Sequence, residues 1–156
     1  MTWLTCTAAL AFLLAVAAPA VAGDGFRVVD GDGLRQGKER VRLWGVDAPE
    51  LDQTCERDGA VYPCGGVAAD ILRAFVGSEP VACVEVEKDR YGRTVARCQV
   101  GGVDLGALMV GAGWAVDFER YSGGHYVPYQ DAAKQAGRGL WHGSFAMPWE
   151  WRKQNN

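Results

Sequence analysis

Three clusters of acidic and basic side chains in this 156-residue chain are of types that could carry out chemistry. The first is Asp30-Gly31-Asp32-Gly33, the second runs from Arg42 to Asp47-Ala48-Pro49-Glu50, and the third is Asp89-Arg90-Tyr91-Gly92-Arg93. Cleavage of a phosphodiester needs hard oxygen ligands for a cation, a base for water, and guanidinium groups for the charge that gathers on phosphorus. The clusters contain each of these types, so they indicate phosphodiester chemistry.

Short strands and a few helices are predicted to position these clusters. Alternating apolar residues and turn residues predict strands over 26–30, 34–36, 40–46, 81–86 and 94–100. Apolar residues at helical spacing predict helices over 66–77, over 105–112 with Asp104 as N-cap, and over 129–136. The predicted fold class is therefore mainly β with helices (α+β): a five-stranded OB-fold barrel with about three packed helices.

Length and composition fit one globular domain. Hydrophobic residues make up 49% and charged residues 22% of the chain, which argues against disorder, and the length is too short for two ordinary domains. The net charge of −3 weighs against nucleic-acid binding through a broad basic surface, although it leaves room for a local basic site.

Residues 1–22 contain no charged side chain and end in Ala20-Val21-Ala22, which matches a secretory cleavage site. We expect a signal peptide over 1–22 and a mature domain over 23–156, in a secreted or periplasmic protein. An uncleaved membrane anchor is the alternative, although the apolar centre is short and Pro19 follows it. A lipid-modified Cys6 is a weaker alternative, because the residues before it fit a lipoprotein signal poorly.

Four cysteines remain after the predicted signal: Cys55, Cys64, Cys83 and Cys98. An even number in an exported chain predicts two disulfides, for which three pairings exist. Position favours Cys55–Cys64 and Cys83–Cys98, because the second pair brackets the 89–93 turn symmetrically. A zinc site is the competing interpretation, but no Cys-x-x-Cys spacing supports it.

The three clusters resemble those of the thermonuclease (staphylococcal-nuclease-like) family. The resemblance is carried by Val29-Asp30-Gly31-Asp32, by Arg42-Leu43 with Val46-Asp47-Ala48-Pro49-Glu50, and by Asp89-Arg90-Tyr91-Gly92-Arg93. Weaker similarity continues through Gly113-Trp114-Ala115 and 137–141. The family fold is an OB barrel with helices packed on it, in agreement with the element order expected above.

The resemblance implies a Ca²⁺ site. Asp32 and Asp47 would bind the ion through their carboxylates, the backbone carbonyl of Ala48 would be a further ligand, and waters would complete the coordination. Asp30 would lie next to the metal and support its ligands.

The resemblance also implies roles for five side chains around the phosphate. Glu50 would position and deprotonate the attacking water. Arg42 and Arg93 would bind the phosphate oxygens, since their forked donors match a phosphate. Tyr91 and Tyr121 would flank the nucleotide.

Three departures from the family pattern lie close to these residues. Gly33 and Ala48 each replace a Thr that is usual in the family. An insert over 52–64, with its predicted disulfide, is expected to sit beside Glu50 and to restrict which substrates enter.

Taken together, the sequence predicts a secreted Ca²⁺-dependent endonuclease that hydrolyses DNA and/or RNA, a monomer with nucleic acid as its partner and no stable membrane partner. The alternative is a non-catalytic OB-fold module that binds nucleic acid, and a third option is a phosphoesterase for short oligonucleotides. Plainer interpretations also exist: a simple turn at 30–33, a structural ion pair between Arg42 and Glu50, and a turn-packing ring at Tyr91.

Overall fold

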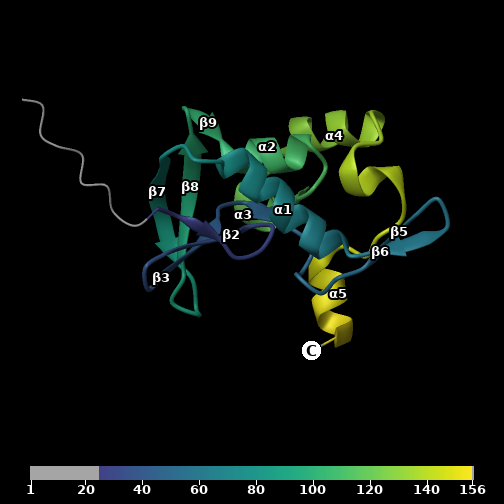
Figure 1. Cartoon of the computed structure of the whole chain (residues 1–156), viewed down its shortest axis with the longest axis horizontal. Helices are drawn as coiled ribbons and strands as arrows, with labels where there is room; N and C mark the ends of the chain where they lie inside the picture. The colour runs from purple at the N-terminus through teal and green to yellow at the C-terminus, as the bar shows by residue number, and fades with distance from the viewer. Residues whose placement is uncertain (1–24, 156) are drawn as a thin grey trace, which may run out of the picture.

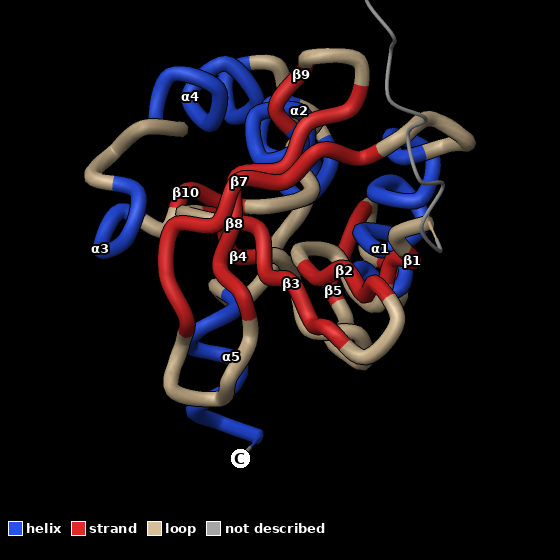
Figure 2. Tube along the Cα trace, turned by 90° about the vertical axis from the view of Figure 1, so that its left-hand side faces the viewer, coloured by secondary structure: helices blue, strands red, loops and turns tan. Residues whose placement is uncertain are grey.

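The structure, a computed structural model, describes residues 25–155; the predicted signal peptide over 1–22 lies outside them. Its central element is a six-stranded mixed sheet that curls into a half-barrel (Figure 1, Figure 2). Along the sheet the order is β1 (Arg27–Val28), β2 (Gly33–Gln36), β3 (Glu39–Leu43), β8 (Thr94–Val100) and β7 (Val81–Lys88), with β9 (Val103–Asp104) paired to β8. Neighbouring strands are antiparallel except β3 and β8, which are parallel.

Two small sheets and five α-helices complete the described part of the chain. Strand β4 (Val46–Asp47) pairs with β10 (Val116–Asp117), and β5 (Cys55–Arg57) pairs with β6 (Ala60–Tyr62). The helices are α1 (Cys64–Val76), α2 (Leu105–Gly111), α3 (Glu119–Ser122), α4 (Val127–Gln135) and α5 (Pro148–Asn155), with a 3₁₀ turn η1 (Gly139–His142). The predicted α+β class is confirmed, with two more helices than the three expected from the sequence.

The core lies between the curled sheet and the helices α1 and α2. Inward-facing residues of β2, β3 and β8 meet the apolar faces of the two helices, and the buried residues include Leu34, Val41, Leu43, Ala96, Ala68, Leu72, Leu105 and Met109. Removing this apolar surface from water is the main driving force for the fold. Asp104 begins α2 as predicted, since its carboxylate accepts a hydrogen bond from the Ala107 amide at 2.9 Å.

The strand predicted over 40–46 is interrupted, which corrects one sequence-based expectation. β3 ends at Leu43, and the chain turns at Trp44-Gly45 before β4 begins. Gly45 has a φ of 69°, which a residue with a side chain rarely adopts, and its carbonyl accepts the Phe118 amide at 2.9 Å. The turn places both Val46 and Asp47 in buried positions instead of alternating them across a strand.

Both predicted disulfides are present in the structure. Cys83 and Cys98 are directly paired residues of β7 and β8, and Cys55 joins the start of β5 to Cys64 at the start of α1. Within residues 25–155, no helix combines the length and the apolar character that crossing a membrane requires.

Candidate active site

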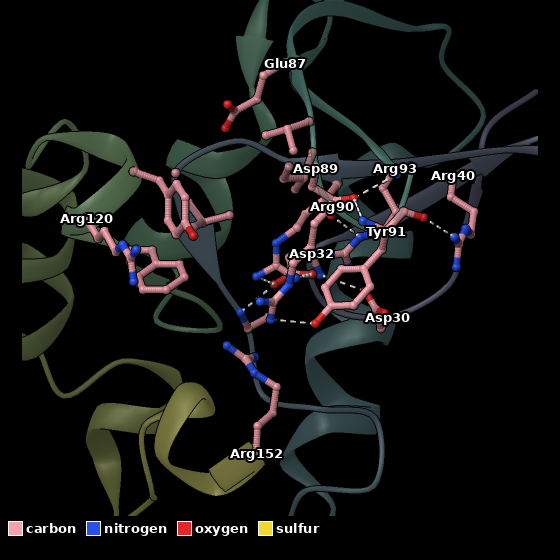
Figure 3. A pocket seen from close by; sticks show the side chains of 18 of the residues that line it. Asp30, Asp32, Arg40, Glu87, Asp89, Arg90, Tyr91, Arg93, Arg120 and Arg152 are labelled. Atoms are coloured by element: carbon pink, nitrogen blue, oxygen red, sulfur yellow. Dashed lines mark hydrogen bonds and ion pairs between the residues drawn. The ribbon is translucent and has the colours of Figure 1, made fainter. Parts of the chain in front are cut away.

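An open cavity of about 870 Å³ lies where β3, β4, the β7–β8 turn and α5 meet (Figure 3). In Figures 1 and 2, α5 and the β7–β8 turn lie at the same end of the molecule. The predicted site residues that line the cavity are Asp30, Asp32, Arg42, Ala48, Glu50, Tyr91, Arg93 and Tyr121. Asp47 lies beneath them with no exposed surface. The structure therefore gathers all of these residues around one cavity.

Arg42 joins the two carboxylates that were predicted to bind metal. Its Nη1 donates to Oδ1 of Asp32 at 3.2 Å, and its Nη2 donates to Oδ1 of Asp47 at 2.6 Å. The pairing of β2 with β3 sets this arrangement, because Gly33 lies opposite Arg42 in the register. The Ala48 amide donates to Oδ2 of Asp32 at 3.0 Å. Asp32 and Asp47 are thus held side by side under one guanidinium.

The surroundings of Asp32 favour an additional cation beside it. Burial raises the pKa of Asp32 to about 7; the charges of Asp30 and Asp47 add to the rise, and Arg42 and the Ala48 amide oppose it. The charge of Asp32 raises the pKa of Arg42, against the effect of burial. A second positive charge beside Asp32 would therefore stabilise its ionised form.

The donor chemistry fits calcium. Carboxylate and main-chain oxygens are hard ligands, and calcium accepts a mixture of side-chain, backbone and water oxygens. Among residues 25–155 no group of three or more His, Cys, Asp or Glu side chains is arranged to hold a metal. A metal at Asp32 and Asp47 would therefore depend on main-chain and water ligands in addition to the two carboxylates. The predicted Ala48 carbonyl would be one such main-chain ligand.

Glu50 is held in place through its main chain by Gln53, a residue that the sequence analysis missed. The Glu50 amide donates to Oε1 of Gln53 at 3.2 Å, and the Glu50 carbonyl accepts the Gln53 amide at 2.8 Å. The Gln53 side chain is fully buried, and its Nε2 donates to the Ala146 carbonyl at 2.8 Å. A lone Gln in a loop carries no sequence signal for this role.

The first turn of α1 packs directly against the main chain of Glu50. Gly65 makes this approach possible, because a Cβ atom at this position would overlap the Glu50 carbonyl oxygen. The neighbouring Cys64 is tied by its disulfide to Cys55, which anchors the same turn of the helix. The position of Glu50 therefore depends on α1 as well as on β4.

The β7–β8 turn orients Arg93 and Tyr91. Asp89 accepts hydrogen bonds from the amides of both residues at 2.9 Å and from Nε of Arg93 at 2.7 Å (Figure 3). Burial alone would raise the pKa of Asp89, but the hydrogen bonds from Arg93 and Tyr91 outweigh it and lower the pKa. Because the bond to Asp89 uses Nε, the two Nη groups of Arg93 can still bind a phosphate. The Tyr91 ring is 59% exposed at the edge of the cavity.

Tyr121 belongs to an aromatic cluster built from α3 and α5. Its ring meets Phe118 edge-on at 4.9 Å between centroids, and Phe118 stacks on Trp149 at 5.4 Å with an interplanar angle of 9°. Tyr121 itself is 50% exposed. Arg120, next to it in the chain, lies across the cavity from Arg93 and Arg40 in Figure 3. Tyr91 and Tyr121 thus both line the cavity.

Arg152 of α5 is the second site residue that the sequence analysis missed. Its guanidinium donates to both carboxylate oxygens of Asp47, at 3.0 and 2.8 Å, and to Oε1 of Glu50 at 2.6 Å. Burial alone would lower the pKa of Arg152, but the hydrogen bonds to Asp47 and Glu50 outweigh it and raise the pKa. The apolar residues of α5 lack helical spacing, and Asp47 lies 105 positions away, so no local pattern pointed to this contact.

The 52–64 insert lies beside Glu50 as expected at Gln53, which bonds to the Glu50 main chain, but no residue of the insert lines the cavity. Residues 55–62 form the β5–β6 hairpin. The hairpin instead pairs with the segment before α5, since the amide and carbonyl of Glu56 bond to Ser144 at 3.0 and 2.9 Å. A two-stranded hairpin can pair along its edge, and this pairing fixes the β5–β6 hairpin against the segment before α5.

Comparison with known proteins identifies the family. Residues 40–143 match the family described as "Staphylococcal nuclease homologue", so the chain belongs to the staphylococcal nuclease homologues. The resemblance to the thermonuclease family is thereby confirmed.

Individual relatives differ in their names and lengths. The succinoglycan biosynthesis protein ExoI of Rhizobium meliloti is 41% identical over 117 residues, covering 73% of this chain and 61% of that protein. Micrococcal nuclease of Shigella flexneri is 32% identical over 165 residues, covering 93% of this chain and 90% of that protein. A probable endonuclease, LCL3, of Clavispora lusitaniae is 34% identical over 120 residues, covering 70% of this chain and 50% of that protein. The chain thus spans half to two thirds of two of these relatives and nine tenths of the third.

Proposed function

We propose that this protein is a Ca²⁺-dependent phosphodiesterase that cleaves within DNA or RNA chains. The observation that supports it most directly is the bridging of Asp32 and Asp47 by Arg42, with Glu50 beside them in the same cavity. The names of two relatives, micrococcal nuclease and probable endonuclease, point the same way. The ExoI relative is named for biosynthesis, so the names alone would not decide the activity.

Calcium would be held by the carboxylates of Asp32 and Asp47 and by the Ala48 carbonyl, with Asp30 alongside. When bound, the ion would supply positive charge beside the phosphate and help to orient the attacking water. The replacement of the family's usual Thr by Ala48 keeps a backbone carbonyl and removes a hydroxyl, so the main-chain ligand is retained.

Side chains of the protein would carry out the proton transfer and bind the phosphate and the nucleotides. Glu50 would accept the proton of the water that attacks phosphorus. The P–O bond to the leaving oxygen would break, and that oxygen would take up a proton from solvent water. Arg42 and Arg93 would donate hydrogen bonds to the phosphate oxygens, where negative charge grows in the transition state. Tyr91 and Tyr121 would contact the nucleotides on either side.

The charge around the cavity supports a polyanionic substrate despite the net charge of −3. Seven basic side chains line the cavity against five carboxylates. The basic residues are Arg40, Arg42, Lys88, Arg90, Arg93, Arg120 and Arg152. A local excess of positive charge attracts the phosphate backbone even when the whole chain is acidic.

We further propose that residues 1–22 are a signal peptide and that the mature domain, 23–156, acts as a monomer outside the cytoplasm without a stable membrane partner. The two disulfides support an oxidising compartment, because such bonds are rare in the reducing cytosol.

The test is a calcium titration against cleavage. Residues 23–156, purified from an oxidising compartment, would be incubated with end-labelled single-stranded DNA, duplex DNA and RNA of several lengths. We expect cleavage that rises with Ca²⁺ and stops when a chelator is added. Absence of cleavage in a folded, calcium-binding, disulfide-intact sample that still binds nucleic acid would favour the non-catalytic binding module instead.

A further inference from the structure

Arg152 donates hydrogen bonds to both carboxylate oxygens of Asp47, which the proposed calcium site needs as a ligand. Oδ1 of Asp47 accepts from Arg42 at 2.6 Å and from Arg152 at 3.0 Å, and Oδ2 accepts from Arg152 at 2.8 Å. Asp47 has no exposed surface, so its charge is balanced by the two guanidinium groups above it. The same Arg152 holds Oε1 of Glu50 at 2.6 Å.

A divalent ion bound to Asp47 would stand close to both guanidinium groups. Like charges a few ångströms apart in a partly buried site repel each other strongly. Calcium also needs a carboxylate oxygen at about 2.3–2.6 Å, and both oxygens of Asp47 already accept from guanidinium nitrogens. Binding of the ion would therefore be favoured by movement of one guanidinium away from Asp47.

Arg152 is the guanidinium that can move more readily. Arg42 projects from β3 inside the sheet, is anchored to Asp32 as well as Asp47, and its side chain is 16% exposed. Arg152 projects from the eight-residue helix α5, and its side chain is 29% exposed. Movement of a long side chain on a short outer helix disturbs less packing than movement of a buried strand residue.

We propose that Arg152 is the counter-ion of Asp47 and Glu50 in the metal-free protein, and that calcium displaces it and loosens the docking of α5. The inference rests on the proposed calcium site and adds a residue and a helix to it. By thermodynamic linkage, the factor by which the Arg152–Asp47 contact weakens calcium binding is the factor by which calcium weakens that contact. Release of Arg152 also frees Oε1 of Glu50, one of the two carboxylate oxygens that could accept the proton of the attacking water.

The first test is the calcium affinity of Arg152→Gln, measured by isothermal titration calorimetry without any substrate. We expect Arg152→Gln to bind Ca²⁺ about tenfold more tightly than the wild type, since coupling between linked sites is typically of this order. Lys153→Gln is the matched control, because it removes the same charge from the exposed neighbouring position and should change the affinity less than about twofold.

The second test uses the unaltered protein, so it does not depend on a variant that folds. Amide hydrogen exchange over residues 148–155 would be compared with and without Ca²⁺. We expect faster exchange in α5 when calcium is bound, together with slower exchange around β4.

These two tests distinguish a failure of the inference about Arg152 from a failure of the proposed calcium site. Equal or weaker calcium binding by Arg152→Gln, with exchange in α5 unaffected by calcium, would overturn the inference and leave the calcium site standing. No calcium binding in either protein would overturn the proposed calcium site and the inference with it. Calcium binding by Arg152→Gln alone would support both.

Discussion

The side chains around Arg42 are of two kinds: those that form a buried charge cluster with it, and those that orient other residues of the cavity. Asp32, Asp47 and Arg42 form a buried charge cluster whose geometry is set by strand pairing. Arg93 reaches the same cavity from a separate turn and is oriented by Asp89. A buried pair is costly to disrupt by removing one partner, so the more exposed Arg93 is the better residue for testing catalysis without unfolding.

Replacement of Arg93 by Lys should lower kcat by about 10²–10³-fold, because the ammonium group keeps the charge and loses the paired donors to the phosphate. Thermal unfolding should change little, since the Arg93 side chain is 29% exposed. The measurement is single-turnover cleavage with calcium at saturation. The matched control is Arg97→Lys, an exposed arginine of β8 that lies over Trp44 at 3.8 Å; an equal loss there would contradict the assigned role.

Replacement of Gln53 by Ala should lower the free energy of unfolding by about 1–3 kcal/mol, because the Glu50 amide and the Ala146 carbonyl lose their buried partner. Urea unfolding measures this loss. Gln99→Ala, at an exposed position of β8, should cost less than about 0.5 kcal/mol. If both variants unfold at the same urea concentration, Gln53 does not support the Glu50 loop.

The site residues found from sequence are those whose types define the chemistry. The carboxylates, the two arginines and the tyrosines stand in short motifs, so their order along the chain was informative. Gln53 and Arg152 stand in no motif, because their roles come from contacts with Ala146 and Asp47, far away in the chain. Such roles become visible only once the fold brings the segments together.

At the scale of elements, the position of Glu50 depends on the packing of α1 against the chain that follows β4. Strands with alternating apolar residues and helices with apolar spacing were predicted well, because those periods directly reflect burial. The turn at Gly45 was missed because its flanking residues, Trp44 and Val46, fit the residue pattern of a strand. The β5–β6 hairpin and α5 were missed because neither carries a buried apolar stripe.

Replacement of Gly65 by Ala should both destabilise the protein and reduce cleavage, because the added Cβ overlaps the Glu50 carbonyl oxygen and forces α1 and Glu50 apart. We expect a stability loss of about 1–3 kcal/mol, as for overpacking. Gly66→Ala is a stringent control in the same helical turn, because a Cβ there meets nothing within 4 Å. It should be neutral or stabilising by about 0.4–1 kcal/mol. The reverse ranking in thermal unfolding would contradict this packing argument.

At the scale of the whole molecule, the charge distribution differs from the composition. The chain carries a net charge of −3, yet basic side chains outnumber carboxylates among the residues that line the cavity. Composition could predict only that a local basic site was possible; the fold was needed to bring Arg40, Arg120 and Arg152 to the motif arginines. The recruitment of these residues from separate elements explains how an acidic chain can present a basic cavity.

Binding of single-stranded DNA should weaken steeply with salt, because each phosphate contact releases counter-ions. Arg120→Gln should reduce the slope of log K against log salt by about 0.7, the value for one contact to a single strand. Fluorescence anisotropy in a chelator, which prevents calcium-dependent cleavage, measures this slope. Arg27→Gln, an exposed arginine of β1 that is not among the cavity-lining residues, should leave the slope unchanged. Equal slopes for the wild type, Arg120→Gln and Arg27→Gln would show that Arg120 does not contact the bound DNA.

The most direct test of the central claim pairs cleavage with calcium binding in Glu50→Gln. The substitution keeps the size of the side chain and removes the base, so we predict that calcium still binds, the fold is intact, and cleavage falls by about 10²–10⁴-fold, as expected for loss of a general base. Calorimetry and single-turnover cleavage on the same preparation would establish this. Cleavage at the wild-type rate by a calcium-loaded Glu50→Gln protein would contradict the account, because the proton of water would then have to go elsewhere.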